Sequence, residues 1–425
     1  MKPPRATDRC RACGNGRLVD VLSLGAQALT GVFPRARDEA VPEGPLELIR
    51  CAGNEDEACG LVQLRHDFDP EALYGDGYGY RSGLNPSMAR HLRKLAIWAL
   101  ARAEAGPGAL IVDIGSNDGT LLAAMPAHAK LAGVDPLARR FAAGYPPGTI
   151  LVPELFSAER VRRELGQRQA ALVIAAAMFY DVADPLEFLR GARSLLADDG
   201  LLVLELAYWP TLLERTAFDT ICHEHVAYYG LSQLLWLAKR AGLAVLEAEL
   251  NDANGGSFRV AFGVAGGPRS PRPEGISSLL EDERALQSDA LHARFRERVL
   301  ERRDALRAIV RSAAAEGRPI AGYGASTKGN VLLQFAGFTT KEIPVIGEVN
   351  GDKFGCFTPG TRIPIAPEDE VRRAYRDLLV LPWHFREFIV RKEEPFLRAG
   401  GRLLFPLPKP QWWTSADLQG TVASD

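Results

Sequence analysis

Residues 109–122 read ALIVDIGSNDGTLL, an apolar run followed by a turn that contains Gly115 and Gly119. The apolar run predicts a buried strand, and the residues after the turn predict the start of a helix. Glycine between a strand and a helix lets a ligand approach the backbone closely. This stretch therefore predicts a strand–turn–helix unit of an α/β sheet, with a ligand site at the turn.

The motif at this turn, D-x-G-x-N-D-G, lacks the G-x-G-x-x-G spacing of a dinucleotide fingerprint. Asp135 lies sixteen positions after Gly119, at the end of the next predicted strand, where its carboxylate would accept hydrogen bonds from both ribose hydroxyls. An adenosine ligand without a pyrophosphate fits better than NAD, so we expect S-adenosylmethionine (SAM). A structural turn that binds nothing is the alternative, and Asp118 could instead cap the helix. The candidate cofactor residues are Asp113, Gly115, Asn117, Asp118, Gly119 and Asp135.

Further elements extend this unit in both directions. Apolar residues at helical spacing predict a helix over residues 85–105, which ends near Gly106, before the first strand. Residues 130–135, 170–179 and 200–209 are apolar runs separated by helical stretches. Strands that alternate with helices imply a parallel sheet covered on both faces, in a domain that we place at residues 76–265.

A second α/β unit is predicted beyond a breaker rich in Pro and Gly, residues 266–275. Residues 276–316 are highly charged with apolar residues at helical spacing, which predicts an amphipathic helix that bridges two domains. Residues 318–335 read as strand, glycine-rich turn and helix, and further apolar runs follow. We therefore expect a C-terminal α/β domain over residues 317–415.

Four of the six cysteines lie in the first 60 residues, in a region with few periodic segments. Cys10 and Cys13 form a C-x2-C pair, and Cys51 and Cys59 follow at a wider spacing that suggests an insertion. Four thiolates close a tetrahedral zinc site, which would stabilise a segment that builds little core. Such a site keeps no open position, so we expect structural zinc in a domain over residues 1–75. Free thiols are the alternative.

Bulk composition argues against several classes of protein. The formal net charge is −2 and no basic residues form a stripe, so neither nucleic acid nor an anionic membrane is an expected partner. No apolar run is long enough to span a bilayer, and the first ten residues lack the apolar core of a secretory signal. We expect a soluble cytoplasmic protein, as a monomer or a small homo-oligomer.

Residues 220–229, TICHEHVAYY, place two imidazoles around a carboxylate. Histidine titrates in the range of a general base, and a carbon nucleophile needs a base to remove a weakly acidic C–H proton. In an extended segment His223 and His225 would share one face and Glu224 the other, so metal binding by both histidines is also open. A packing or hydrogen-bonding role alone is the remaining alternative.

A further polar motif, GYGASTKGN, occupies residues 322–330. It does not match the P-loop pattern, but backbone amides at the helix start, with Ser326, Thr327 and Lys328, could hold a diphosphate. A tight structural turn is the alternative. The next polar loop, which would help to hold a sugar nucleotide, contains Glu348, Asn350 and Lys353.

The chain resembles the sugar C-methyltransferases of deoxysugar biosynthesis in its motifs taken together. These are C-x2-C, CGLVQL (59–64), VDIGSNDGTLL (112–122), HEH (223–225), GYGASTKGN (322–330) and FTPGTRIPI (357–365). The resemblance covers nearly the whole chain. It implies a small N-terminal zinc-binding domain, a central class I SAM-methyltransferase Rossmann-like domain and a C-terminal Rossmann-like α/β domain. The implied substrate is a nucleotide-linked 4-keto sugar, typically a dTDP-4-keto-6-deoxy sugar.

The resemblance also implies roles for individual residues. His225 would remove the proton beside the ketone, Glu224 would orient or assist it, and His223 is a further catalytic candidate. The resulting enolate would take the SAM methyl group. Substrate contacts are implied for Tyr78, Tyr80, Cys222, Tyr323, Lys328, Asn330, Glu348 and Lys353.

Two positions depart from the family pattern. Cys222 precedes H-E-H where the family commonly has Tyr, and Tyr180-Asp181 stands where a His usually follows the fourth strand. An O- or N-methyltransferase on a related sugar, which needs no enolate, is an alternative. So is a non-catalytic protein that binds SAM or a sugar nucleotide.

Overall fold

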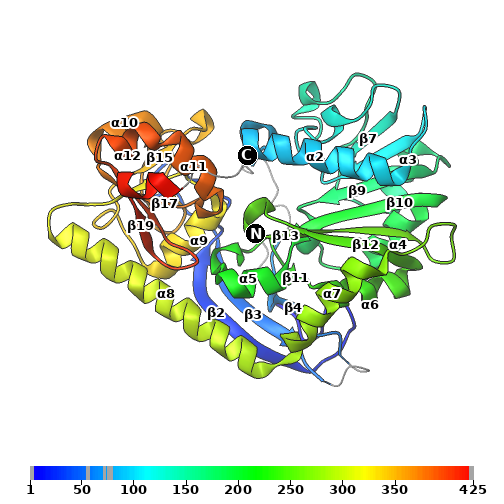
Figure 1. Ribbon diagram of the computed structural model, residues 1–425, viewed down its shortest axis with the longest axis horizontal. Coiled ribbons are helices and arrows are strands. Elements are labelled where there is room, and N and C mark those ends of the chain that lie inside the picture. The colour runs from blue at the N-terminus through cyan, green and yellow to red at the C-terminus, as the bar shows by residue number, and fades with distance from the viewer. Residues whose placement is uncertain (1–3, 54–57, 70–72, 74–79, 421–425) are drawn as a thin grey trace.

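The computed structural model describes residues 4–53, 58–69, 73 and 80–420. Two α/β units lie side by side, and a β-ribbon and one long helix run beneath both of them (Figure 1). The first unit contains the middle of the chain, and the second contains its C-terminal part. Within the described residues, no helix is long and apolar enough to cross a membrane.

A seven-stranded sheet forms the middle unit. Its strands are β6 (Leu110–Ile114), β7 (Lys130–Val134), β8 (Ile150–Val152), β9 (Ala170–Ala176), β10 (Leu196–Ala207), β12 (Leu243–Asn251) and β13 (Ser257–Val264). The order is β12-β13-β10-β9-β6-β7-β8. The five strands from β10 to β8 are parallel, and the sequence predicts all of them except β8. Strand β13 runs antiparallel to both of its neighbours, which the sequence did not predict.

Successive residues of the central strands face two different apolar layers. Ile111 packs with helix α2 (Pro86–Ala103) on one face of the sheet. Val112 packs with α4 (Pro185–Leu195) and α6 (Leu231–Ala241) on the other. This alternation confirms that helices cover both faces of the sheet. The unit also contains the short helices α3 (Ala158–Leu165) and α5 (Trp209–Arg215).

The turn after β6 is not followed by the α-helix that the sequence predicts. Between residues 115 and 129, all of them described, the chain forms turns and one 3-10 turn, η2 (Leu122–Ala124). Pro126 explains the difference, because it has no amide hydrogen and holds Met125 in an extended conformation with ψ 154°. The six residues between Gly119 and Pro126 form turns and this single 3-10 turn.

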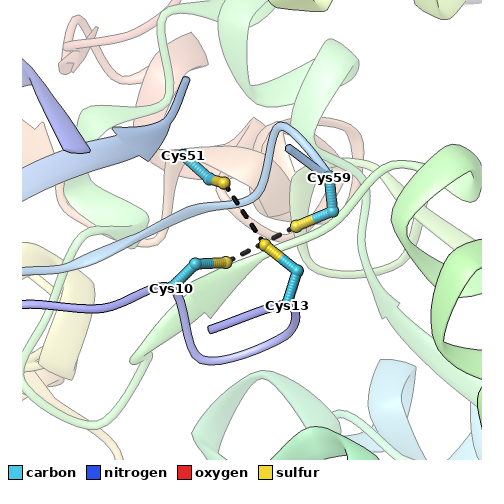
Figure 2. A group of neighbouring side chains, drawn as sticks. All are labelled: Cys10, Cys13, Cys51 and Cys59. Atoms are coloured by element: carbon cyan, nitrogen blue, oxygen red, sulfur yellow. Dashed lines mark hydrogen bonds between the residues drawn. The ribbon is translucent and has the colours of Figure 1, made fainter. Parts of the chain in front are cut away.

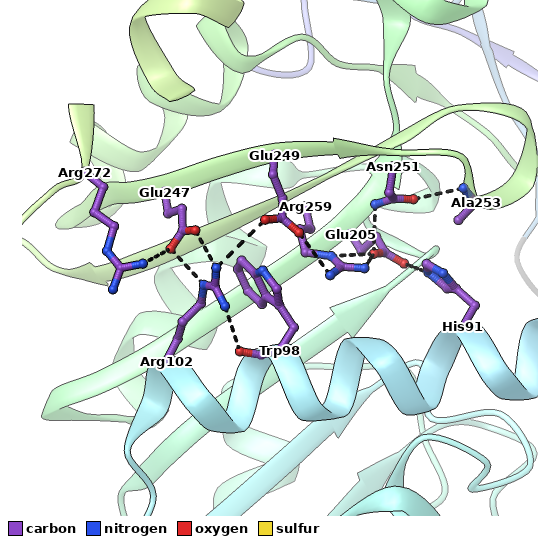
Figure 3. Close-up of polar contacts among 10 residues, drawn as sticks. All are labelled: His91, Trp98, Arg102, Glu205, Glu247, Glu249, Asn251, Ala253, Arg259 and Arg272. Atoms are coloured by element: carbon purple, nitrogen blue, oxygen red, sulfur yellow. Dashed lines mark hydrogen bonds and ion pairs between the residues drawn. The ribbon is translucent and has the colours of Figure 1, made fainter. Parts of the chain in front are cut away.

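Helix α2 is tied to the sheet by a row of ion pairs and hydrogen bonds (Figure 3). The buried carboxylate of Glu205, on β10, accepts hydrogen bonds from Arg259 at 2.9 Å and Asn251 at 3.1 Å, and it also contacts His91 of α2. Farther along the same helix, Arg102 donates to the Glu247 carboxylate at 2.6 and 2.8 Å. The row therefore joins α2 to β10, β12 and β13.

The N-terminal region forms a four-stranded antiparallel sheet. Its strands are β2 (Leu18–Ala28), β3 (Glu43–Cys51), β4 (Val62–Leu64) and β11 (Ala227–Tyr228), in the order β11-β4-β3-β2. Strand β11 begins two residues after His225, so the chain joins the N-terminal sheet just after the H-E-H motif. Two short strands, β1 (Arg5–Ala6) and β5 (His66–Asp67), pair with each other.

The expectation that this region builds little core is wrong. Val21, Leu22 and Leu48 of the β2–β3 ribbon are buried in one apolar cluster with residues of the C-terminal unit. The ribbon buries its apolar face against another unit, and a pattern search within the first 75 residues cannot see that partner.

The predicted bridging helix over residues 276–316 is divided in the structure. It consists of α7 (Pro273–Asp282), the 3-10 turn η7 (Glu283–Gln287) and α8 (Asp289–Ala315). The break lies at Ser288, whose side chain caps α8 by accepting a hydrogen bond from Leu291 N. Helix α8 runs beneath the β2–β3 ribbon toward the C-terminal unit (Figure 1).

A six-stranded sheet forms the C-terminal unit, in the order β16-β15-β14-β17-β18-β19. Its strands are β14 (Ala321–Tyr323), β15 (Ile346–Glu348), β16 (Ile365–Pro367), β17 (Asp377–Val380), β18 (Arg402–Phe405) and β19 (Gln411–Trp413). All neighbours are parallel except β18 and β19. The helices are α9 (Thr327–Ala336), α10 (Glu368–Ala374), α11 (Arg386–Lys392) and α12 (Glu394–Arg398). The predicted strand–turn–helix over residues 318–335 is confirmed.

Candidate active site

The glycine-rich turn after β6 packs closely against its surroundings. Gly115 has a φ of +75°, and a Cβ there would lie 2.8 Å from Met178 Cγ. Gly119 has a φ of +80°, and a Cβ there would lie 2.8 Å from Tyr145 Cγ. Both positions combine a left-handed backbone with a close contact, so only glycine fits without strain.

Asp135 directly follows β7, as the sequence predicts. Its carboxylate accepts hydrogen bonds from Asn117 N at 2.9 Å and Leu137 N at 2.8 Å, and it remains half-buried. Burial raises its pKa, and these two backbone N–H groups oppose that shift. A carboxylate has lone pairs beyond two backbone bonds, so Asp135 can still accept a hydrogen bond from a ligand.

The other acidic residues of the turn are buried. Asp113, on β6, lies inside the sheet, where burial first and the charge of Asp135 second raise its pKa well above the usual range. Asp118 accepts hydrogen bonds from Gly83 N at 3.0 Å and from the Thr120 hydroxyl at 2.6 Å. It therefore caps no α-helix and instead holds the segment that precedes α2.

Asn117 holds the same segment. Its side-chain amide donates to the Tyr80 carbonyl at 3.1 Å, and its side-chain oxygen accepts from Ser82 N at 2.9 Å. Tyr80 exposes 46% of its surface beside this turn. Tyr78, the other predicted sugar contact, lies outside the described residues.

The H-E-H motif forms a turn and not the extended segment on which its predicted facing depends. His225 N donates to the Cys222 carbonyl at 3.1 Å, which closes the turn. The three side chains of the motif consequently have separate environments. Among the described residues, the four N-terminal cysteines are the only group of three or more potential metal ligands close together.

His223 is fully buried against the N-terminal sheet. Its Nε2 hydrogen-bonds the Gly44 carbonyl at 3.3 Å, and its ring meets Phe68 edge-on at 4.6 Å between centroids. Burial lowers its pKa to about 4, so the imidazole is neutral at physiological pH. These contacts support a packing role, and the catalytic assignment of His223 stays a prediction.

Glu224 also lies against the N-terminal region. The Thr30 hydroxyl donates to its Oε2 at 3.4 Å, and a Cβ on Gly31 would lie only 2.7 Å from its Oε1. The Cys222 thiol is within hydrogen-bonding range of the same carboxyl group. Burial raises the pKa of Glu224, so its protonated form is favoured more than in water.

His225 is the one residue of the motif that is not fully buried. Its Nδ1 contacts the Thr220 carbonyl at 2.7 Å and must therefore carry the proton, which leaves Nε2 as the free base. Burial first, and the Lys328 charge second, lower its pKa to about 3. The imidazole is thus neutral at physiological pH, and in the ligand-free protein its Nε2 binds a proton only weakly.

The segment around the 3-10 turn η4 (Phe179–Asp181) lies between His225 and the glycine-rich turn and contacts both. The ring of Tyr180 lies 4.3 Å from that of His225, between centroids. Met178, two residues earlier, covers Gly115. The candidate base and the predicted cofactor turn therefore lie on either side of one short segment after β9, where the sequence indicated only a departure from the family pattern.

The C-terminal unit brings Lys328 to the same region. Lys328, in the first turn of α9, donates from Nζ to the Asn254 carbonyl at 2.9 Å. Trp383 Nε1 donates to the buried carboxylate of Asp219 at 2.7 Å, which joins the two units again. Asp219, Asn254 and His384 belong to no recognisable motif, so they could not be predicted from the sequence.

Two predicted substrate contacts are buried in structural networks. The Tyr323 hydroxyl donates to Glu393 at 3.0 Å and accepts from Lys392 at 3.0 Å. Asn330 is fully buried and donates to the Thr30 carbonyl at 2.8 Å. The Asn330 side-chain oxygen has no hydrogen-bond partner among the described residues, and the substrate roles of both residues stay predictions.

Glu348 and Lys353 shape the turn that precedes α9. Glu348 accepts from Ala325 N at 2.8 Å, and Lys353 donates from Nζ to the Ala325 carbonyl at 2.7 Å. Ser326 caps α9 by accepting from Gly329 N at 3.0 Å. The turn is therefore held by contacts from β15, from the 3-10 turn η8 (Gly351–Lys353) and from α9.

The four N-terminal cysteines converge as the sequence predicts (Figure 2). Their sulfur atoms all lie within 4.8 Å of one another, and the pairs Cys10–Cys59 and Cys13–Cys51 are each 3.5 Å apart. Zinc bonds to sulfur are about 2.3 Å long, which places the sulfurs of a tetrahedral site about 3.8 Å apart. The four thiols fit a closed zinc site.

Comparison with known proteins assigns these regions. A zinc binding domain matches residues 10–74, a methyltransferase domain matches residues 88–248, and a C-methyltransferase C-terminal domain matches residues 252–408. The chain is 35% identical to C-methyltransferase NovU from Streptomyces niveus over 416 residues, which cover 96% of this chain and 97% of that protein. The chain belongs to the C-methyltransferase family.

This C-methyltransferase is therefore a SAM-dependent enzyme that acts on a small molecule, and it carries a zinc-binding domain. Two solved methyltransferase structures align with less than half of the chain. N-methyltransferase NodS from Bradyrhizobium japonicum, in complex with S-adenosyl-L-homocysteine, aligns with 42% of this chain and 88% of its own, at 16% identity and a TM-score of 0.31. Magnesium protoporphyrin IX methyltransferase (ChlM) from Synechocystis, with bound SAM, aligns with 45% of this chain and 88% of its own, at 14% identity and a TM-score of 0.32.

Proposed function

We propose that this C-methyltransferase methylates the carbon beside the ketone of a nucleotide-linked 4-keto sugar, through an enolate. The observation that carries the proposal is the unprotonated Nε2 of His225, fixed by the Thr220 carbonyl and one short segment away from Gly115. Methylation at carbon requires a base to take a C–H proton, and Nε2 of His225 has a free lone pair because Nδ1 carries the proton.

The ketone makes this proton transfer feasible, because the negative charge of the carbanion is delocalised onto the carbonyl oxygen. The C–H bond breaks, the proton moves to His225 Nε2 and the electron pair becomes that of the enolate. A negative charge beside the ring raises the basicity of His225 from the low value of the sugar-free protein. The imidazole thus becomes a stronger base as the enolate forms.

Gly115, Asn117 and Asp135 are the residues that would hold SAM. The turn offers a close backbone approach at Gly115, and Asp135 retains acceptor capacity for ribose hydroxyls. When bound, SAM supplies an electrophilic methyl group that an enolate carbon can accept.

The C-terminal unit, residues 317–415, would hold the nucleotide. The start of α9 offers backbone N–H groups and the hydroxyls of Ser326 and Thr327, a combination that suits a diphosphate. Residues 76–265 would carry the cofactor and the base, and residues 1–75 the zinc. We further infer a cytoplasmic location, with the enzyme as a monomer or small homo-oligomer.

Solvent deuterium exchange in the absence of SAM tests the proposal. A 4-keto-sugar nucleotide, such as a dTDP-4-keto-6-deoxy sugar, is incubated with the enzyme in D2O and followed by NMR. We expect exchange at the carbon beside the ketone, and a loss of about 10²- to 10⁴-fold in His225→Gln. His128→Gln, a change at an exposed histidine, is the matched control. An O- or N-methyltransferase would show no exchange, and its methyl transfer would survive His225→Gln.

A further inference from the structure

A group of charged and polar groups lies where the middle and C-terminal units meet. It comprises the side chains of Lys328 of α9, of Asp219 of the 3-10 turn η5 (Phe218–Thr220), and of Trp383 and His384 of η9 (Trp383–Phe385), together with the backbone carbonyl of Asn254 of η6 (Ala253–Gly255). Asp219 is fully buried, and one oxygen of its carboxylate has no hydrogen-bond partner within the described residues. A buried carboxylate in this state needs a neighbouring positive charge.

Lys328 supplies that charge. Its side chain points away from the start of α9 and toward the middle unit. The Ser326 side chain is engaged with Gly329 N at the helix start. The Lys328 ammonium instead reaches across to the Asn254 carbonyl at 2.9 Å, in the middle unit. An ammonium that binds a diphosphate at the start of α9 should point toward that helix start and not toward the Asn254 carbonyl.

The same 3-10 turn also holds the candidate base. Asp219 and Thr220 are consecutive residues of η5: Asp219 interacts with the Lys328 charge, and the Thr220 carbonyl fixes Nδ1 of His225. Helix α9 packs on η5. The ammonium and the imidazole are therefore anchored on neighbouring residues of one short element.

We propose that Lys328 belongs to the carbon-methylation site and stabilises the negative charge that develops on the sugar carbonyl oxygen while His225 takes the proton. The proposal rests on the proposed enolate function. In this step the C–H bond breaks, the proton moves to Nε2, and the electron pair ends on an oxygen that faces the ammonium. A fixed donor beside a developing oxyanion lowers the barrier because it needs no reorganisation.

The charges around Lys328 agree with this role. Burial lowers the pKa of Lys328, and the neighbouring Asp219 carboxylate opposes that shift. In turn, the Lys328 charge lowers the pKa of His225 and of His384, in each case as the second cause after burial. One ammonium thus favours neutral imidazoles around it and can pair with a transient anion.

The test compares Lys328→Met with Lys328→Arg, with Lys341→Met as a control at an exposed lysine. Two quantities are measured on the full-length enzyme: the affinity for dTDP, and the deuterium exchange rate at saturating 4-keto-sugar nucleotide without SAM. We expect Lys328→Met to slow exchange about hundredfold, to leave dTDP affinity unchanged, and to be partly rescued by Lys328→Arg. Unchanged exchange, or a loss confined to dTDP affinity, would overturn the proposal.

Asp219→Asn provides an independent readout if Lys328→Met does not fold. Without the carboxylate the pKa of Lys328 falls, so the high-pH limb of the exchange profile should move to lower pH. A profile that keeps its shape would contradict the assignment. If the wild-type enzyme shows no exchange at all, the enolate route fails. A fall in dTDP affinity in Lys328→Met would separately identify Lys328 as a phosphate ligand.

Discussion

At the scale of single residues, backbone carbonyls decide the state of the histidines in the H-E-H motif. The Thr220 carbonyl fixes the tautomer of His225, and the Gly44 carbonyl takes the Nε2 hydrogen bond of His223. Glu224, which the sequence suggested as the orienting group, contacts Thr30 and Cys222 instead. Its assistance to the base stays a prediction.

His223 should make the stability of the enzyme depend on pH. Its folded pKa of about 4 lies below the unfolded value of about 6.5, so the fold favours the neutral ring. This contribution is complete above the unfolded pKa and is lost as the pH falls toward 4. Between pH 7.5 and pH 5 it should cost about 2 kcal/mol of the free energy of unfolding.

Urea unfolding of wild type and His223→Gln at both pH values measures this contribution. The variant keeps an amide donor for the Gly44 carbonyl but cannot titrate. It should lose less stability on acidification than wild type, by about that 2 kcal/mol. Equal losses in the two proteins would mean that His223 titrates normally in the fold.

At the scale of elements, the row of contacts in Figure 3 should control helix α2. Glu205 is buried and accepts hydrogen bonds from Arg259 and Asn251, besides its contact with His91. Glu205→Gln removes the charge and leaves the buried Arg259 without its main partner, which should cost about 3–5 kcal/mol. Urea unfolding measures the loss, and Glu281→Gln, at an exposed residue of α7, is the control.

The same variant should also weaken SAM binding. Helix α2 begins directly after the segment that Asn117 and Asp118 hold, so a loosened helix disturbs the cofactor turn. Hydrogen exchange should rise in residues 86–103, and the affinity for SAM, measured by calorimetry, should fall. If hydrogen exchange in α2 is as slow in Glu205→Gln as in wild type, the apolar contacts alone hold the helix.

Elements and single-residue contacts differ in how far the sequence predicts them. Apolar periodicity and glycine-rich turns are local signals, so the parallel strands, the α2 helix and the strand end at Asp135 could be predicted. Side-chain direction within a turn depends on contacts made by distant segments. The H-E-H turn therefore sends His223 and Glu224 toward the N-terminal region, and Lys328 of the C-terminal unit reaches the middle unit.

At the scale of the whole molecule, the N-terminal sheet connects the zinc site with the candidate base. Cys51 ends β3, and Cys59 lies three residues before β4, which pairs with β11. The chain that forms β11 leaves the H-E-H turn directly. Gln233 of α6 adds a second connection, because its side chain donates to the Cys59 carbonyl at 2.8 Å. A change at the four cysteines should therefore reach His225 through the backbone.

Zinc removal should consequently separate the two halves of the reaction. Structural zinc contributes its binding energy to the fold around it, so a chelator should loosen β3 and β4 and, through β11, the H-E-H turn. The turn after β6 has no covalent or hydrogen-bonded link to the four thiols among the described residues, so SAM should still bind. We expect chelated enzyme, or Cys13→Ser, to lose deuterium exchange while calorimetry gives an unchanged SAM affinity. Cys356→Ser, at a cysteine outside the cluster, is the control. It should retain deuterium exchange and SAM affinity, and elemental analysis should still find its zinc. A parallel loss of SAM affinity and exchange would mean that zinc supports the whole fold and not the carbon site through β11.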